Sequence, residues 1–451
     1  MSTLLVRNAA MLVTMDATRR EIPGGGLFAR DGFIELVGPT ESLPTTADAV
    51  LDLSGQILLP GLVNCHHHLD QVLTRALPEG QNAGLFDWLR AHYRIWARRT
   101  PEASRTATLI GMSELARSGC TTVFDHAYLF RNGCRIDDQI GAAAEIGMRY
   151  VASRGSMSLG QSKGGLPPDE CVEQEDDIMA DSERVIARYH NPNPGALQQI
   201  VLAPCSPFSV TPELMRAQAV LARSKGVRLH THLCETIDEE EFTQRTYGAR
   251  PVAYMESLGW QGDDVWYAHA VHVNDAEIAY FARHGTGVCH CPSSNMRLGS
   301  GIAPLRKYRN AGVRVGLGVD GSASNDACNL LAETRQAMLL ARLRTEGQPF
   351  MSARDVLEIA TRGGASVLGR SDIGALEAGK CADFFSIDLN VGAFAGALAD
   401  PVAAVVFCAP QPARHTYVHG KPVVSDGAIV TIDMERTIRE HNRHAAALIA
   451  A

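Results

Sequence analysis

The strongest constraint on the fold is an alternation, after Pro60, of short apolar segments with longer amphipathic segments. Short apolar segments bounded by turn residues predict buried strands, and an apolar period of 3.6 residues predicts helices. Eight such strands follow one another over roughly 260 residues, the number and size typical of a (β/α)8 barrel of the TIM type. The predicted strands are 62–65, 121–125, 149–153, 200–203, 228–232, 265–269, 287–291 and 314–319.

Amphipathic segments between these strands predict the helices that a barrel requires. A doubly wound open sheet is the alternative, but no G-x-G-x-x-G motif opens any predicted helix. The predicted helices include 101–117, 136–146, 176–189, 212–224, 275–282 and 330–343.

The two ends of the chain have β character and predict a second, smaller domain. Segments 4–15 and 27–38 are predicted strands joined by a turn at Gly24–Gly26, and 49–59 adds further strands. Near the other end, strands are predicted at 382–388, 402–408, 415–418 and 421–424, before a helix at 434–450. The predicted domains are a small β-sandwich-like domain from 1–59 and 372–430, the inserted barrel at 60–371, and a C-terminal helix at 431–451.

Composition favours a soluble enzyme that acts on a small molecule. A net charge of −8 gives no reason to expect nucleic acid or an anionic membrane as a partner. No apolar run reaches membrane-spanning length, and residues 1–16 lack the apolar core of a signal peptide. The 11 cysteines are scattered rather than framed as disulfide pairs. These features predict a cytoplasmic protein with reduced thiols.

Polar residues close four of the eight predicted strands, where a barrel of this type carries its chemistry. His66 and His68 end the first strand and lie on one face of it, because strand side chains alternate. His232, His269 and Asp320 end the fifth, sixth and eighth strands, and no comparable residue is assigned to the other four. A solvated polar turn explains each residue singly. Their joint occurrence predicts a metal site.

His66, His68, His232 and Asp320 form a ligand set that suits Zn²⁺ and also Fe²⁺, with one position left for water. Glu235, three residues beyond His232, is placed to take that water's proton and deliver it to a substrate nitrogen. Asp320 can share the role of base. His269 is predicted to act on the substrate or on a developing oxyanion.

These residues occur in P-G-L-V-N-C-H-H-H, H-L-C-E-T, A-H-A-V-H, C-P-S-S-N-M-R-L-G-S-G and G-L-G-V-D-G-S-A-S-N-D. The motifs resemble those of the amidohydrolase superfamily, in particular its mononuclear deaminase and chlorohydrolase branch. The resemblance runs from about residue 4 to 426 and implies the same ligands, His66, His68, His232 and Asp320, with Glu235 and His269 catalytic. The fourth strand, 199–205, lacks the lysine that bridges two metals in binuclear members, so one divalent metal is expected.

The resemblance implies hydrolysis of an exocyclic amine or chloride from a heteroaromatic ring, by attack of metal-bound hydroxide on the ring carbon. Gln71 lies where guanine-deaminase-like members place a substrate-binding glutamine. Arg154 can pair with a ring carbonyl, and Trp88 can pack on the ring. Cys205 replaces an arginine of guanine-deaminase-like members, which argues against plain guanine. Loop bonding, a salt bridge and core packing are the alternatives for Gln71, Arg154 and Trp88.

Segments around 153–169 are most similar to 8-oxoguanine deaminases, which convert 8-oxoguanine and water to urate and ammonia. Deamination of isoxanthopterin or guanine and s-triazine aminohydrolysis of the hydroxyatrazine type are the alternatives within the branch. A ring-opening cyclic amidase and a catalytically inactive scaffold are alternatives from other classes. Self-association into a homo-oligomer is also implied. Cys289, His290 and Cys291 are interpreted as strand packing rather than as a second metal site, and His67 as facing away from the metal.

Overall fold

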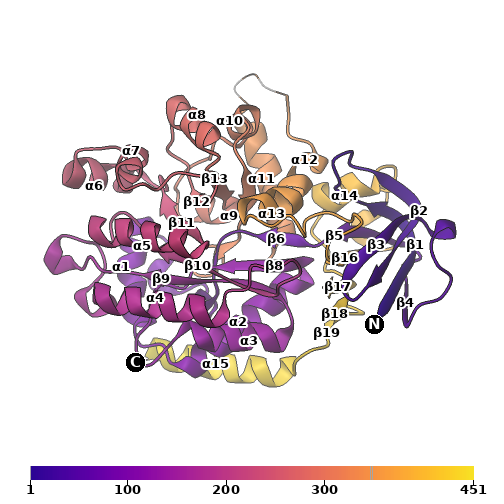
Figure 1. Cartoon of the computed structure of the whole chain (residues 1–451), viewed down its shortest axis with the longest axis horizontal. Helices are drawn as coiled ribbons and strands as arrows, with labels where there is room; N and C mark the ends of the chain where they lie inside the picture. Colours follow the sequence, from indigo (N-terminus) through magenta and orange to yellow (C-terminus); the bar gives the residue numbers. More distant parts are fainter. Residues whose placement is uncertain (1, 346, 348, 451) are drawn as a thin grey trace.

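The eight predicted strands close into a parallel barrel in the computed structural model, which describes residues 2–345, 347 and 349–450 (Figure 1). The barrel closes where the last strand pairs with the first, through Leu317 and Asn64. In order around the barrel, the strands are β6 (Leu62–Asn64), β8 (Cys120–Asp125), β9 (Arg149–Ser156), β10 (Gln198–Pro204), β11 (Arg228–Leu233), β12 (Val265–His269), β13 (Gly287–His290) and β14 (Val315–Leu317).

Helices surround the barrel, and several begin and end on the signals that their sequences carry. The first turn of α2 is capped by the Thr100 hydroxyl, which accepts from Ala103 N, and α3 ends at Gly147 with φ 81°. The predicted helices are present as α2 (Pro101–Arg117), α3 (Ile136–Ile146), α4 (Glu175–Tyr189), α5 (Pro212–Lys225), α8 (Asp275–His284) and α11 (Leu330–Leu343). Further helices are α1 (Leu85–Trp96), α6 (Ile237–Tyr247), α7 (Pro251–Ser257), α9 (Pro292–Arg297), α10 (Leu305–Ala311), α12 (Ala353–Glu358) and α13 (Gly364–Val367).

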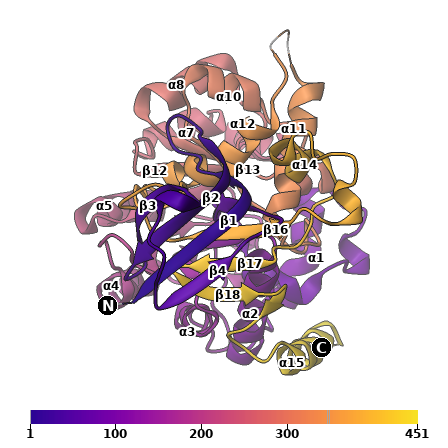
Figure 2. The same cartoon turned by 90° about the vertical axis from the view of Figure 1, so that its right-hand side faces the viewer.

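Both ends of the chain contribute to one mixed nine-stranded sheet at one end of the molecule (Figures 1 and 2). The N- and C-terminal parts meet where β5 and β16 pair antiparallel, with Leu59 opposite Phe385. The sheet order is β19 (Ala428–Ile429), β18 (Lys421–Ser425), β17 (His415–Val418), β16 (Phe384–Asp388), β5 (Gln56–Pro60), β1 (Thr3–Val13), β2 (Glu21–Arg30) and β3 (Phe33–Pro39), with β4 (Ala49–Asp52) beside β1.

Two local predictions in this sheet region are wrong. Gly24–Gly26 lies within strand β2 and is not a turn. The backbone of the neighbouring strand comes so close that a Cβ at Gly26 would lie 2.2 Å from Val6 O, which explains the glycine there. Segment 402–408 is largely helical, as α14 (Pro401–Phe407), although its valine-rich sequence favours a strand. Asp400 caps this helix by accepting from Ala403 N, and Pro401 occupies its first turn.

The C-terminal helix α15 (Met434–Ala450) lies along the barrel side formed by α2 (Figure 1). Its Leu448 packs with Leu73 and with Ala103 and Ala107 of α2. Among the described residues, no helix combines the length and apolar character needed to cross a membrane.

Candidate active site

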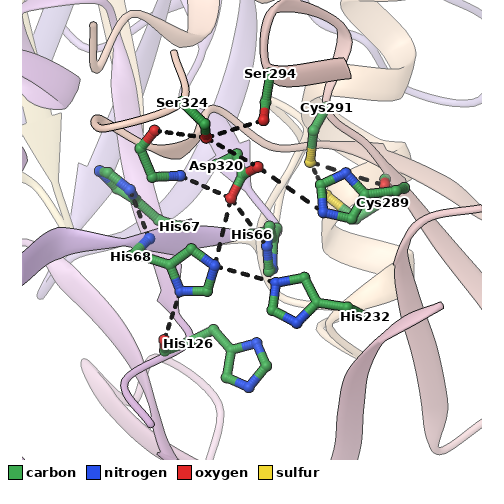
Figure 3. A network of polar contacts seen from close by, with 12 residues as sticks. His66, His67, His68, His126, His232, Cys289, Cys291, Ser294, Asp320 and Ser324 are labelled. Carbon is green, nitrogen blue, oxygen red and sulfur yellow. Dashed lines mark hydrogen bonds and ion pairs between the residues drawn. The ribbon is translucent and has the colours of Figure 1, made fainter. Parts of the chain in front are cut away.

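The two predicted histidine ligands of the first strand meet the other predicted ligands at one end of the barrel (Figure 3). His67 and His68 form the short strand β7 (His67–His68), which pairs in parallel with β15 (Asp320–Gly321). This pairing brings Asp320 Oδ1 to 3.2 Å from His66 Nε2 and 3.4 Å from His68 Nε2. His232 Nε2, from β11, lies 3.1 Å from His68 Nε2.

Main-chain carbonyls set the tautomers of His68 and His232. His68 Nδ1 donates to His126 O at 2.7 Å, and His232 Nδ1 donates to Cys205 O at 2.6 Å. Each Nδ1 therefore carries the proton and each Nε2 presents a lone pair. Two lone pairs that face each other at 3.1 Å repel unless a cation lies between them.

His66 is oriented by a second imidazole. His230 Nδ1 donates to Trp266 O at 3.0 Å, so its Nε2 accepts from His66 Nδ1 at 2.9 Å. His66 Nε2, fully buried, then has no partner of its own among the described residues except the nearby Asp320 carboxylate.

The electrostatics of the cluster give its members the protonation states of metal ligands. Burial lowers the pKa of His66 to about 3, so the imidazole is neutral. Burial would raise the pKa of Asp320, but His66, His269 and His68 outweigh it and hold this pKa well below its ordinary value. Three neutral imidazoles and one carboxylate fit a divalent metal ion. Two groups of four, His66, His68, His126, His232 and His66, His232, His269, Asp320, have ligand atoms within 4.8 Å of one another.

Glu235 and His269 lie beside this cluster. Glu235 Oε2 is 3.6 Å from His269 Nε2, which is 3.8 Å from Asp320 Oδ2. Burial raises the pKa of Glu235 to about 7. Burial would lower the pKa of His269, but Glu235, Asp320 and a hydrogen bond from its Nδ1 to Asn295 Oδ1 raise it overall.

The backbone around these residues is held in conformations that residues other than glycine rarely adopt. φ is 54° at Cys234, 70° at His269 and 60° at Asp320. Glu239, on α6, accepts from Cys234 N at 2.8 Å and from Glu235 N at 3.0 Å. Helix α6 therefore fixes the turn that presents Glu235.

A cavity opens beside the cluster. Helix α1, which is not among the predicted helices, forms one wall with Leu85, Trp88, Leu89 and Tyr93. The complete lining is His68, Gln71, Leu85, Trp88, Leu89, Tyr93, Tyr128, Cys205, Phe208, His232, Glu235, His269, Leu298, Asp320 and Ser324.

Three of the four predicted substrate-binding residues, Gln71, Trp88 and Cys205, line this cavity. Arg154 does not. Its side chain is buried and pairs with Glu173 at 2.7 Å and Asp181 at 2.6 Å. The salt bridge considered as the alternative for Arg154 is therefore the interaction that the structure contains.

The second and seventh strands also end in titratable residues, which corrects the expectation that only four strands do. Asp125 and His126 follow one another at the end of β8, and His290 ends β13. His126 supports His68 through its carbonyl, and Asp125 Oδ1 accepts from Leu69 N at 2.8 Å. The adjacent Asp-His pair after an apolar strand is the sequence signal that could have identified them.

The structure agrees with two interpretations made from the sequence: His67 faces away from the predicted metal ligands, and Cys289 and Cys291 pack in the core. His67 accepts from His68 N at 2.8 Å through Nδ1 (Figure 3). Its Nε2 lies 3.4 Å from Cys328 Sγ. Cys289 and Cys291 are buried with their sulfurs 4.0 Å apart, in an apolar cluster that includes Cys65.

The amidohydrolase family model matches residues 57–423. The chain is 48% identical to 8-oxoguanine deaminase of Pseudomonas aeruginosa over the full length of both proteins. It is 38% identical to hydroxydechloroatrazine ethylaminohydrolase of Pseudomonas sp. strain ADP, covering 96% of this chain and 93% of that one. The crystal structure of atrazine chlorohydrolase TrzN from Arthrobacter aurescens TC1, complexed with zinc, superposes with a TM-score of 0.92 at 34% identity, covering 99% of this chain and 100% of that one. The chain therefore belongs to the amidohydrolase family.

Proposed function

We propose that this hydrolase deaminates an oxidised purine, converting 8-oxoguanine and water to urate and ammonia. The observation that carries the proposal is the convergence of three imidazole Nε2 lone pairs and the Asp320 carboxylate beside Glu235, at the edge of a largely apolar cavity. Family membership and the deaminase relatives support a hydrolase that cleaves C–N bonds.

His66, His68, His232 and Asp320 would hold one divalent metal, for which we propose zinc, with Fe²⁺ as the alternative. When bound, the metal lowers the pKa of a water molecule so that this water can act as a nucleophile at neutral pH. The zinc-containing structure of the TrzN chlorohydrolase supports zinc.

Glu235 is proposed to take the proton from the attacking water and pass it to the ring nitrogen next to the amine-bearing carbon. A carboxyl group whose pKa is about 7 suits transfer in both directions near neutral pH. His269, oriented by Asn295, directs Nε2 toward Glu235 and Asp320 and can donate to the oxygen that adds to the ring. The oxygen of water bonds to the ring carbon and its second proton passes to the exocyclic amine. The exocyclic C–N bond then breaks, ammonia leaves, and the oxygen remains on the ring carbon as a carbonyl.

Support for the substrate comes from the relatives and from the cavity wall. The relative that is 48% identical to this chain is an 8-oxoguanine deaminase. An isoxanthopterin deaminase is 37% identical to this chain, and the hydroxydechloroatrazine ethylaminohydrolase is 38% identical to it. Gln71 is buried, lines the cavity, and its Oε1 has no hydrogen-bond partner among the described residues. It can accept from an N–H of the ring.

The direct test incubates zinc-loaded protein with 8-oxoguanine, guanine, isoxanthopterin and hydroxyatrazine, and measures release of ammonia or amine. We expect the largest kcat/KM for 8-oxoguanine. Rapid turnover of another ring without turnover of 8-oxoguanine would show that the substrate assignment is wrong. Sedimentation of the same preparation tests the predicted self-association.

The variant Glu235→Gln tests the proton-transfer role. It keeps the shape of the side chain but removes the proton acceptor, so we expect kcat to fall about 100-fold or more. Zinc content, measured by atomic absorption, should stay at the wild-type value because Glu235 is not a proposed ligand. Wild-type turnover by this variant would exclude the role.

A further inference from the structure

Most polar side chains of the active-site cavity are already engaged by the protein. Trp88 Nε1 donates to Ala323 O at 3.1 Å, and Ser324 Oγ is hydrogen-bonded to Ser294 Oγ at 2.9 Å. Burial raises the pKa of the Cys205 thiol and of the Tyr128 hydroxyl, and interactions with Ser209 and Ser206 and with Gln71, respectively, oppose this increase.

Tyr93 is different. Its side chain is fully buried, lines the cavity, and its hydroxyl has no hydrogen-bond partner among the described residues. Burial raises its pKa well above 10, so the hydroxyl keeps its proton and can donate. A buried hydroxyl without a partner costs free energy, which a ligand acceptor would recover.

Helix α1 explains how this hydroxyl reaches the cavity. Leu85, Trp88, Leu89 and Tyr93 follow the spacing of one helix face, and all four line the cavity. The other three present apolar surface or an engaged N–H. Within the described part of the chain, Tyr93 therefore contributes the one polar group of this wall that lacks a partner. The wall therefore combines a flat apolar surface with one hydrogen-bond donor.

A ring bound for deamination must place its amine-bearing carbon beside His68, His232, Glu235, His269 and Asp320. We propose that the Tyr93 hydroxyl donates to a carbonyl on the far, five-membered side of the substrate ring, and so selects an 8-oxopurine over a purine that carries hydrogen at this carbon. This inference rests on the proposed function and names the substrate group that the cavity recognises, the carbonyl on the five-membered ring. A donor that meets C–H in place of a carbonyl stays unpaired, which is the usual source of such discrimination.

The test compares Tyr93→Phe with the matched control Tyr254→Phe. Tyr254 is a buried tyrosine on α7, stacked on Tyr247 with ring centroids 4.0 Å apart, and it does not line the cavity. We expect Tyr93→Phe to lower kcat/KM for 8-oxoguanine roughly 10- to 100-fold, to change that for guanine less than about 3-fold, and to leave zinc content unchanged. Tyr254→Phe should leave the ratio of the two values unchanged.

Binding without turnover separates this inference from the proposed reaction. Zinc-loaded Glu235→Gln and the double variant Glu235→Gln/Tyr93→Phe are titrated with 8-oxoguanine and with guanine by calorimetry. Loss of 8-oxoguanine affinity in the double variant alone supports the role of Tyr93, even where the wild-type protein shows no deamination. Equal affinities of the two variants for 8-oxoguanine overturn the role of Tyr93. An equal loss of affinity for guanine overturns it as well. Both results leave deamination by the wild type standing. Failure of 8-oxoguanine to bind either variant overturns the inference and the proposed function together.

Discussion

Gly321, the residue after Asp320, shows how one absent side-chain atom shapes the cavity. A Cβ at this position would lie 1.7 Å from Gln71 Oε1 and 2.3 Å from its Cδ. No real pair of atoms tolerates such a distance, so the Gln71 amide occupies its place only because residue 321 is glycine. The recognition proposed for Gln71 therefore depends on its neighbour from β15.

The variant Gly321→Ala should displace the Gln71 amide and lower kcat/KM for the preferred ring about 10-fold or more. Steady-state kinetics with parallel zinc analysis would measure this. The control is Gly141→Ala in α3, where a Cβ meets no atom of the described residues within 4 Å. That change should leave activity unaltered and raise helix stability by up to about 1 kcal/mol. Wild-type kinetics for Gly321→Ala would mean that the position of the Gln71 amide is unimportant.

At the scale of elements, Asp137 joins two helices outside the barrel. This residue of α3 receives two hydrogen bonds from Arg184 of α4, at 2.9 Å and 2.7 Å, and one from Tyr189 at 2.6 Å. The hydrogen bonds from Arg184, the largest cause, lower the pKa of Asp137 from 3.8 to about 2. Because this pKa is lower in the folded than in the unfolded chain, the contribution to stability is complete above about pH 4 and disappears as the pH falls through 2.

Asp137→Asn should therefore lower the free energy of unfolding at pH 7 by about 1 kcal/mol, after allowance for solvent screening of this partly exposed pair. The difference between the variant and the wild type should shrink steadily as the pH falls toward 2, because the wild-type carboxylate becomes protonated over this range. Urea denaturation at pH 7, 4 and 2.5 measures the trend. A difference that grows toward low pH would contradict the assignment.

At the scale of the whole molecule, the proposed ligands come from parts of the chain that are far apart in sequence. His66 and His68 follow the first barrel strand, His232 ends the fifth and Asp320 follows the eighth. The first and last barrel strands pair at one register position, Leu317 with Asn64, and at the short β7–β15 ladder. A bound metal would therefore stabilise the closure of the barrel as well as the site.

Removal of the metal by a chelator should lower the melting temperature. An ion held at 100 times its dissociation constant contributes about 2.7 kcal/mol, which corresponds to roughly 3 °C for a protein of this size. Calorimetry before and after chelation, with zinc added back, measures the effect. The variant His68→Ala, which lacks one proposed ligand, should respond much less. Equal melting temperatures with and without metal in the wild type would argue against this stabilising role.

The barrel could be predicted from the sequence because it follows local rules, and so could the convergence of six side chains at one rim, His66, His68, His232, Glu235, His269 and Asp320. The roles of these residues remain predictions. Alternating apolar segments predict the strands and helices, and strand ends in such a barrel meet at one rim. Local rules failed at 402–408, where an aspartate cap and a proline outweigh the β-preference of valine, and at Gly24–Gly26, where close strand packing requires glycine within a strand. The domain boundaries at 59/60, 371/372 and 430/431 remain predictions.

By itself the sequence determined the fold class and the residues that gather at the rim, since the periodicity and the strand-end positions are properties of the chain. Only the tertiary structure decided which side chains form the cavity wall. It pairs Arg154 with Glu173 and Asp181 instead of placing it in the cavity, and it places Tyr93 of α1 in the cavity wall. The physical reason is that each side chain's direction depends on how its element packs against segments distant in sequence, and no local pattern contains that information.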